Sequence, residues 1–270
     1  MVRVEGPQLV GDPTQRRRSV AFMSDANASK RATSFGQQVG AYDRGRPEYP
    51  AEAVEWMLGT AGPEVLDVGA GTGKLSRAVL ATGRTVVAVD PDAAMLAELT
   101  AREPGVRTVV GSAESLPFPD ASADAVVFGQ AWHWVDPPAA SREVGRVLRP
   151  GGVLGLIWNI RDTAEPWVAE LAGILEASAA ETLVLSEGPS VEAPFAGLET
   201  REFPWTRTLS GEQLGQLAMS RSTMIAASPA DRAVVLAEIN ELAGRVGDGH
   251  GMLRMPYITH AYRAKKPAIR

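Results

Sequence analysis

The residues best suited to chemistry lie in one short turn, which combines a carboxylate with three glycines at alternate positions: Asp67, Gly69, Gly71 and Gly73. An apolar run, 65–68, leads into the turn and is interrupted only by Asp67, a pattern typical of a buried parallel strand. A helical pattern follows from Lys74. Glycine accepts positive φ angles and lets a ligand approach the backbone, and the free amides of a helix start favour a negative group. The turn therefore predicts a ligand site.

The alternative is a turn that only joins a strand to a helix. Each glycine costs roughly 0.5–1 kcal/mol relative to alanine, so three of them favour a ligand or tight packing. The spacing also narrows the choice of ligand. A dinucleotide fingerprint needs glycine in place of Lys74, and a P-loop needs glycine in place of Val68 and Ser or Thr in place of Leu75. Hydride transfer and nucleotide triphosphate binding are therefore disfavoured.

The remaining pattern, Asp67-x-Gly69-x-Gly71-x-Gly73, resembles the first motif of class I S-adenosylmethionine-dependent methyltransferases, and the chain resembles their type 11 group. Later motifs of the family are matched by 111–118, 129–136 and the Leu-Arg-Pro-Gly-Gly of 148–152. The resemblance implies S-adenosyl-L-methionine as cofactor and a small-molecule methyl acceptor. It also implies an α/β fold, a Rossmann-like doubly wound sheet of seven strands in the order 3-2-1-4-5-7-6, the last strand antiparallel, with a helical cap and inserted helices.

The second predicted strand, 86–89, ends in Asp90 and Pro91. In sheets of this kind an acid at that tip lies beside the first turn and can accept hydrogen bonds from the ribose hydroxyls. Because proline suits the first turn of a helix, Asp90 is alternatively the N-cap of the next helix. We favour the ribose role. Met95 matches the family position that packs against adenine, although it also suits an ordinary core position.

Two further loops complete the implied cofactor site. After the third strand, 106–110, the family commonly has Asp where this chain has Ser112, whose hydroxyl can still accept the adenine amino group. The amide of Ala113 is an equally good adenine contact, and Glu114 suits a contact, a surface charge or the start of a turn. Gln130 follows the fourth strand and should lie near the reacting sulfonium. The implied cofactor-binding residues are Asp67, Gly69, Ala70, Gly71, Gly73, Asp90, Pro91, Met95, Ser112, Ala113, Glu114 and Gln130.

His133, which stands between Trp132 and Trp134, is the candidate catalytic residue. It is a possible general base, but a histidine between two tryptophans more often packs against its neighbours or orients them. Methyl transfer depends mainly on alignment, which supplies roughly 7–11 kcal/mol, so neither an acid, a base nor a metal is obligatory. A base becomes important if the acceptor is a phenol, a quinol or a carbon acid. The alternative to an enzyme is a regulatory or assembly protein that binds S-adenosylmethionine without catalysis.

The segment 42–50 reads Tyr-x-x-x-Arg-Pro-x-Tyr-Pro and resembles the trans-aconitate methyltransferase-like subgroup, whose N-terminal segment folds over the cofactor. This implies a carboxylate as acceptor, and a hydroxyl stays open. A carboxylate is already ionised at neutral pH and needs cations to hold it. Each candidate substrate residue also suits a structural or surface role. The candidates are Tyr42, Arg46, Trp132, Trp134, Arg161 and Arg221.

Composition limits the other classes of function. The formal net charge is -5 with scattered basic residues, which argues against nucleic acid as the main partner. There is no cysteine and the three histidines are far apart, so neither a disulfide nor a metal site is predicted. No window approaches the roughly 18 apolar residues of a membrane span, and the N-terminus lacks an apolar signal core, so a cytoplasmic location is expected. The oligomeric state is not indicated.

The elements that position these residues divide the chain into four predicted parts: a flexible tail (1–34), lid helices (35–58), a cofactor-binding core (59–160) and a C-terminal part with edge strands and substrate-capping helices (161–270). In the last part, alternation at 203–209 and 255–264 predicts an antiparallel edge pair. Apolar spacing predicts helices over 166–177, 211–219 and 228–246.

Overall fold

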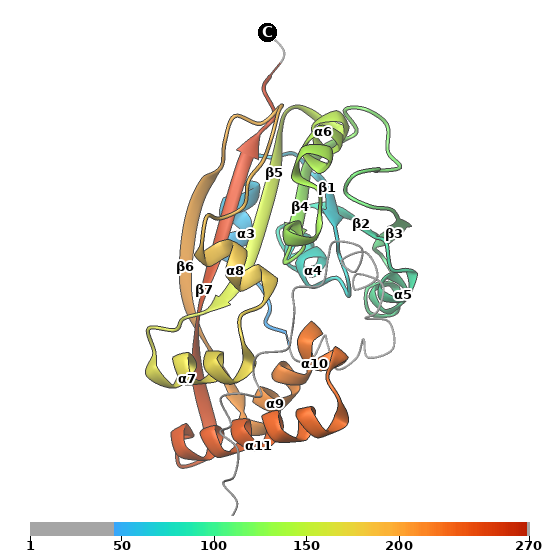
Figure 1. Ribbon diagram of the computed structural model, residues 1–270. Coiled ribbons are helices and arrows are strands. Elements are labelled where there is room, and N and C mark those ends of the chain that lie inside the picture. The colour runs from blue at the N-terminus through green and yellow to red at the C-terminus, as the bar shows by residue number, and fades with distance from the viewer. Residues whose placement is uncertain (1–45, 269–270) are drawn as a thin grey trace, which may run out of the picture.

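The computed structural model describes residues 46–268, which form one mixed sheet between layers of helices (Figure 1). The strands of this part of the chain lie in the order β3-β2-β1-β4-β5-β7-β6, and β7 is antiparallel to both of its neighbours. The predicted strand order is confirmed. The strands are β1 (Glu64–Val68), β2 (Thr85–Asp90), β3 (Arg107–Val110), β4 (Ala123–Gly129), β5 (Leu148–Arg161), β6 (Glu199–Ser210) and β7 (Met252–Lys265).

Helices cover both faces of this sheet, as the doubly wound prediction requires. One face carries α3 (Ala51–Leu58), α4 (Lys74–Leu80) and α5 (Ala93–Arg102), and the other carries α6 (Pro137–Val147) and α8 (Ala179–Leu185). Successive side chains of a strand point to opposite faces. Val65 accordingly packs with α3 and α4, whereas Leu66 packs with α6. Burial on both faces explains the nearly continuous apolar runs of β1, β2 and β4.

The remaining helices gather beyond the end of the sheet at which β5 finishes (Figure 1). They are α7 (Pro166–Leu175), α9 (Gly211–Met219), α10 (Ser222–Ala226) and α11 (Pro229–Val246). Leucines of α7, α9 and α11 share a core with Leu253, Met255 and Tyr257 of β7. The predicted helices over 166–177, 211–219 and 228–246 correspond to α7, α9 and α11, whereas the sequence reading did not predict α8 and α10.

Two of the predicted parts lie wholly or partly outside the described residues. The whole predicted tail (1–34) lies outside them, and so does the first half of the predicted lid (35–45), which contains Tyr42. The second predicted lid helix is α3, which packs on the sheet through Ala53, Val54, Met57 and Leu58, each fully buried. It therefore belongs to the helical layer of the sheet. The division into tail, lid, core and cap stays a prediction.

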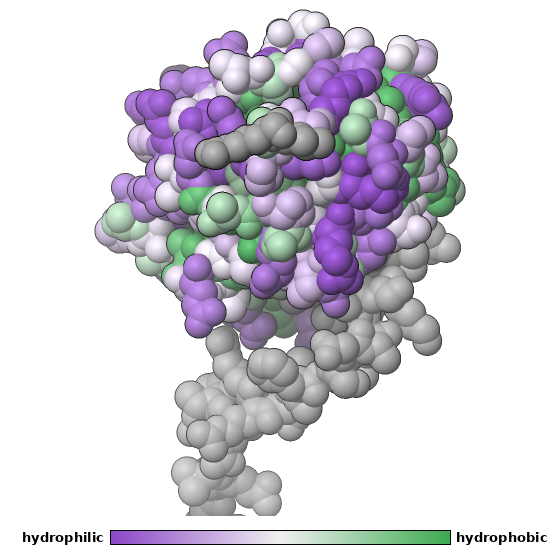
Figure 2. All heavy atoms as spheres, turned by 90° about the horizontal axis from the view of Figure 1, so that it is seen from above, coloured by the Kyte–Doolittle hydropathy of each residue, from purple (hydrophilic) through white to green (hydrophobic). Residues whose placement is uncertain are grey.

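The end of the molecule opposite α7, α9, α10 and α11 has a mixed surface. Figure 2 shows hydrophilic side chains that separate small apolar areas on this side. Among the described residues, no helix is long and apolar enough to cross a membrane. The features suited to chemistry lie at the other end, where β1, β2 and β4 finish.

Candidate active site

The loop between β1 and α4 has a left-handed backbone at each of its three glycines. The φ angle is +70° at Gly69, +54° at Gly71 and +85° at Gly73. A Cβ at Gly69 would lie 2.6 Å from Cβ of Ala131, and one at Gly73 would lie 2.7 Å from Cγ of Leu99. A Cβ at Gly71 would meet nothing within 4 Å. Gly69 and Gly73 therefore serve close packing, whereas Gly71 leaves the backbone open to a ligand.

Asp90 ends β2 beside this loop and is 7% exposed. Its Oδ2 accepts the Gly71 amide at 2.9 Å, and its Oδ1 accepts the Asp92 amide at 2.8 Å. The N-cap of α5 is Asp92, whose side chain accepts the Ala94 amide at 2.8 Å, so Asp90 is not the cap. Burial raises the pKa of Asp90, and the two amide bonds oppose that shift. Each oxygen keeps a lone pair for another donor, such as a hydroxyl.

Asp67 lies at the end of β1 and is fully buried. Its Oδ2 accepts the Ser76 hydroxyl at 2.6 Å, while its Oδ1 has no hydrogen-bond partner among the described residues. Burial raises the pKa of Asp67 to about 7. Buried polar atoms are normally paired, so the lone Oδ1 calls for a donor. An ammonium group beside it would satisfy this oxygen and favour the ionised carboxylate.

A pocket, which we call the glycine-loop pocket, adjoins Asp67. Its lining residues are Arg46, Pro47, Tyr49, Asp67, Gly69, Ala70, Gly71, Thr72, Lys74, Leu75, Gly129 and Gln130. The lining includes one buried carboxylate, that of Asp67, and two cationic side chains, those of Lys74 and Arg46. Lys74 also forms an ion pair with Glu48 at 2.6 Å. This combination suits a zwitterionic amino-acid group, with the ammonium toward Asp67 and the carboxylate toward the cations.

The other predicted cofactor residues lie around the ends of β2 and β3. Met95 and Ala113 are buried. Ser112 forms an isolated bridge with Ser115. Glu114 accepts the amide of Asp136 at 3.1 Å, so it fastens the segment that enters α6. Pro91 stands between Asp90 and the cap of α5. Contacts of these residues with a cofactor stay predictions.

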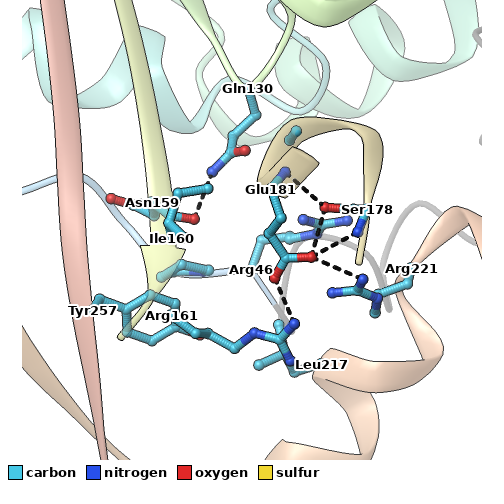
Figure 3. Close-up of a pocket in the computed structure, with 12 residues that line it drawn as sticks. Arg46, Gln130, Asn159, Ile160, Arg161, Ser178, Glu181, Leu217, Arg221 and Tyr257 are labelled. Atoms are coloured by element: carbon cyan, nitrogen blue, oxygen red, sulfur yellow. Dashed lines mark hydrogen bonds and ion pairs between the residues drawn. The ribbon is translucent and has the colours of Figure 1, made fainter. Parts of the chain in front are cut away.

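A second pocket, which we call the arginine pocket, collects three of the candidate substrate residues (Figure 3). Its lining residues are Arg46, Pro47, Gln130, Asn159, Ile160, Arg161, Ser178, Ala180, Glu181, Leu217, Arg221 and Tyr257. Arg161 and Arg221 are 6% and 7% exposed, and each forms an ion pair with Glu181. The arginines come from segments that are far apart in the sequence. The tertiary fold therefore builds a buried cationic site from them.

The two pockets meet at Arg46, Pro47 and Gln130, which line both. Gln130 follows β4 with φ at +57°, an uncommon conformation for a residue other than glycine. Its amide N–H donates to the carbonyl of Ile157 at 2.9 Å, and its Nε2 donates to the carbonyl of Asn159 at 3.2 Å. These bonds hold Gln130 between the glycine-loop pocket and the arginine pocket. A group passed from one pocket to the other would pass this side chain.

The two candidate tryptophans do not line either pocket as the described residues define them. Both lie in a 3-10 turn, η4 (Trp132–Trp134). Trp132 is 2% exposed, packs edge-on against Phe128 and donates its Nε1–H to the carbonyl of Ser190 at 2.9 Å. Trp134 is 37% exposed. Trp132 therefore supports the core and Trp134 is partly exposed, and contact of either ring with an acceptor stays a prediction.

His133 also lies outside both pockets. Its Nδ1 accepts the indole N–H of Trp158 at 3.4 Å. Burial, together with the positive charge of Arg46, lowers the pKa of His133 to about 4. The imidazole is therefore neutral at neutral pH and its acceptor nitrogen is engaged. This geometry favours an orienting role, and a role as general base stays a prediction.

Sequence reasoning did not predict several lining residues of the arginine pocket, among them Asn159, Glu181 and Tyr257. A signal for Glu181 exists, because Ser178-x-x-Glu181 forms a capping box at the start of α8. Asn159 and Tyr257 lie within long strands, where flanking apolar residues conceal them. Asn159 donates to the carbonyl of Glu48 at 3.0 Å and accepts the Thr259 hydroxyl at 2.6 Å.

Comparison with known proteins identifies the family to which this fold belongs. A family model described as a methyltransferase domain matches residues 66–156. An uncharacterized methyltransferase of Mycobacterium tuberculosis is 43% identical over 234 residues, which are 86% of this chain and 95% of that protein. The structure of a candidate type II methyltransferase from Anaeromyxobacter dehalogenans has a TM-score of 0.64 at 25% identity and covers 83% of this chain and 99% of its own.

A more distant structure includes the demethylated cofactor. Phosphoethanolamine N-methyltransferase 2 of Haemonchus contortus, solved with S-adenosylhomocysteine and phosphomonomethylethanolamine, has a TM-score of 0.52 at 16% identity and covers 91% of this chain and 61% of its own. The residues of the glycine-loop pocket fit S-adenosylmethionine. The unpartnered Oδ1 of Asp67 suits its ammonium group, and the open backbone of Gly71 admits the ligand. The chain belongs to the class I S-adenosylmethionine-dependent methyltransferases.

Proposed function

We propose that this enzyme methylates a carboxylate of a small molecule bound in the arginine pocket. The observation that carries the proposal is the convergence of Arg46, Arg161 and Arg221 on a pocket that shares walls with the glycine-loop pocket. A guanidinium group matches a carboxylate in bidentate geometry. The arginines thus suit an anionic acceptor, and Gln130 marks the side on which it faces the cofactor.

The charges of the arginine pocket support the same acceptor. Two buried guanidinium groups, those of Arg161 and Arg221, share the single carboxylate of Glu181, so these three groups keep a net charge of one positive. Buried charges without counter-ions are costly. An anionic ligand would reduce that cost, whereas a neutral or cationic ligand would not.

A carboxylate acceptor also agrees with the position of His133. A carboxylate is ionised at neutral pH, so its oxygen needs no base before it attacks. When bound, S-adenosylmethionine supplies an electrophilic methyl group on a sulfonium. The residues of this chain then have to align the acceptor. Arg161 and Arg221 hold its carboxylate, and Gln130 lies where the acceptor meets the cofactor. Alignment of this kind is worth roughly 7–11 kcal/mol.

The proposal includes the contacts of individual residues with the cofactor. We assign the ribose hydroxyls to Asp90 and the adenine end to Met95, Ser112, Ala113 and Glu114. The trans-aconitate methyltransferase-like subgroup, suggested by 42–50, also agrees with a carboxylate acceptor. Arg46 and Pro47 of that motif line both pockets.

The proposal is tested by incubating the protein and S-adenosylmethionine with a panel of carboxylic acids and matched alcohols, and by searching for methyl esters by mass spectrometry. Arg161→Gln should raise KM for an active acid at least about 10-fold, with unchanged affinity for S-adenosylhomocysteine. Arg245→Gln, which removes an exposed arginine of α11, is the matched control. Methylation of alcohols alone would contradict the proposal. Cofactor binding without turnover on any acceptor would favour the non-catalytic alternative.

A further inference from the structure

Glu181 joins two arginines of the arginine pocket. Its Oε1 lies 2.5 Å from Nη2 of Arg161, and its Oε2 lies 3.0 Å from Nη2 of Arg221. Figure 3 shows the three side chains pointing toward one another from separate elements. Glu181 comes from α8, Arg161 ends β5, and Arg221 precedes α10. An acidic residue of the chain therefore occupies part of the site proposed for the acceptor carboxylate.

The start of α8 holds this carboxylate in place. The amide and the hydroxyl of Ser178 each donate to Oε2 of Glu181 at 2.8 Å. Burial would raise the pKa of Glu181, but the charges of Arg161 and Arg221 outweigh it and hold the pKa well below its usual range. Glu181 is therefore a fixed negative charge at neutral pH.

The ion pairs leave part of each guanidinium group unused. Nη1 of Arg161 and Nε of Arg221 are buried and have no hydrogen-bond partner among the described residues. Both side chains are more than nine-tenths buried. Buried donors without partners are rare, so these two indicate a site for a ligand acceptor atom. The arginine pair is thus shared between Glu181 and a group that the chain does not supply.

We infer that Glu181 determines how much negative charge an acceptor may carry. It neutralises one of the two guanidinium charges of the arginine pair and repels any second carboxylate that comes near the pair. Repulsion between like charges is strong where water is excluded. The pocket should therefore prefer an acceptor that places one carboxylate beside the arginine pair over an acceptor that places two carboxylates there. The inference rests on the proposed function, and Glu181 acts through the arginines as a specificity-determining residue.

A purely structural role is the competing explanation, because Glu181 also caps α8. The chain offers a matched control in the capping box of α9, formed by Ser210 and Gln213. Gln213 occupies the same position of its box as Glu181 but does not line the arginine pocket. A cap role predicts similar behaviour of the Gln213→Ala and Glu181→Gln variants toward anions. A selectivity role predicts that they differ.

The test measures the binding of butyrate and succinate, which have four carbons each but one and two carboxylates. Calorimetry is done on protein saturated with S-adenosylhomocysteine. Wild type should bind butyrate at least as tightly as succinate. Glu181→Gln should raise the ratio of succinate to butyrate affinity by about 10-fold or more. Glu181→Asp keeps the negative charge but moves it away from the arginines by one methylene group, so it should raise the ratio less. Gln213→Ala should leave the ratio unchanged.

Loss of Glu181 leaves two buried arginines without their counter-ion, which destabilises the protein. Thermal unfolding of Glu181→Gln is therefore followed in each salt, and succinate should raise Tm more than butyrate does. If that variant does not fold, the ratio for Glu181→Asp decides. An unchanged ratio in the folded Glu181 variants would overturn the inference alone. Binding of S-adenosylhomocysteine without binding of either acid in any of the proteins would overturn both the inference and the carboxylate acceptor.

Discussion

The backbone amide of Gly71 donates to the carboxylate of Asp90 at 2.9 Å, so the end of β2 is bonded directly to the glycine loop. Parallel pairing of β1 with β2 places Val68 opposite Val89 and brings the two strand ends together. The amides of Gly69 and Ala70 both donate to the carbonyl of Val89, at 2.8 and 3.1 Å. The Asp90 carboxylate and the Gly71 backbone are therefore held side by side, so that one cofactor molecule can contact both.

Asp90→Asn should weaken the binding of S-adenosylhomocysteine by about 1.5–3 kcal/mol, roughly 10- to 100-fold. The reason is that a neutral side-chain amide replaces the charged carboxylate that accepts hydrogen bonds from the ribose. Calorimetry measures the affinity. Asp92→Ala is the control, since it removes the cap of α5 and should lower the free energy of unfolding by about 0.5–2 kcal/mol with unchanged affinity. Equal loss of affinity in both variants would assign the Asp90 effect to general damage.

Gly71→Ala and Gly73→Ala should separate ligand binding from packing. Both place a Cβ on a left-handed backbone, which costs roughly 1–2 kcal/mol. A Cβ at Gly73 would also press on Leu99, whereas one at Gly71 would meet no neighbour. Urea unfolding should therefore show the larger loss of stability for Gly73→Ala. Relative to that loss of stability, calorimetry should show the larger loss of affinity for S-adenosylhomocysteine in Gly71→Ala. Wild-type affinity in Gly71→Ala would contradict the placement of the cofactor on this backbone.

The pKa of Asp67 predicts a pH dependence of stability in the protein without cofactor. This pKa is raised from 3.8 to about 7, so the folded state holds a proton that the unfolded chain releases. The stabilisation is complete below pH 3.8 and is lost as the pH rises toward about 7. Between pH 5 and 7, wild type should lose roughly 2–3 kcal/mol relative to Asp67→Asn. Urea unfolding of both proteins at several pH values measures the difference, and a constant difference would contradict the shift.

His133→Gln should reduce kcat by less than about 10-fold if His133 only orients its neighbours, because general base catalysis typically contributes 10²–10⁴-fold. Since its pKa is lowered to about 4, His133 stays neutral from pH 5.5 upward and should add no ionisation to the pH profile of kcat there. The profile of the variant should keep the wild-type shape. A loss above 100-fold together with the disappearance of one ionisation would establish His133 as the base.

Most of the sheet could be predicted from the sequence, because β1, β2 and β4 are apolar runs and parts of β6 and β7 alternate between apolar and polar residues. Local signals were less certain at element ends. Asp90 and Asp92 flank Pro91, and either carboxylate fits a cap by residue type. Only the structure shows that Asp92 caps α5 and leaves Asp90 at the glycine loop.

The arginine pocket shows where sequence reasoning stops. Arg161 and Arg221 were each predicted as substrate residues, but their pairing through Glu181 depends on how α8 packs on the sheet. The direction in which the two tryptophan side chains point could not be predicted from the sequence either. Trp132 and Trp134 lie within the motif loop 129–136, yet the direction of their side chains is set by the turn η4 and by the core that receives Trp132. Tertiary packing decides both outcomes.

The central claim is that the cofactor occupies the glycine-loop pocket and faces the arginine pocket at Gln130. A crystal structure of the protein with S-adenosylhomocysteine tests it most directly. The account predicts ribose hydroxyls within about 2.5–3.2 Å of the Asp90 carboxylate, the ammonium group on Oδ1 of Asp67, and the sulfur on the side of Gln130 that opens to Arg161 and Arg221. Density for the ligand at another place, or a sulfur directed away from Gln130, would contradict the account.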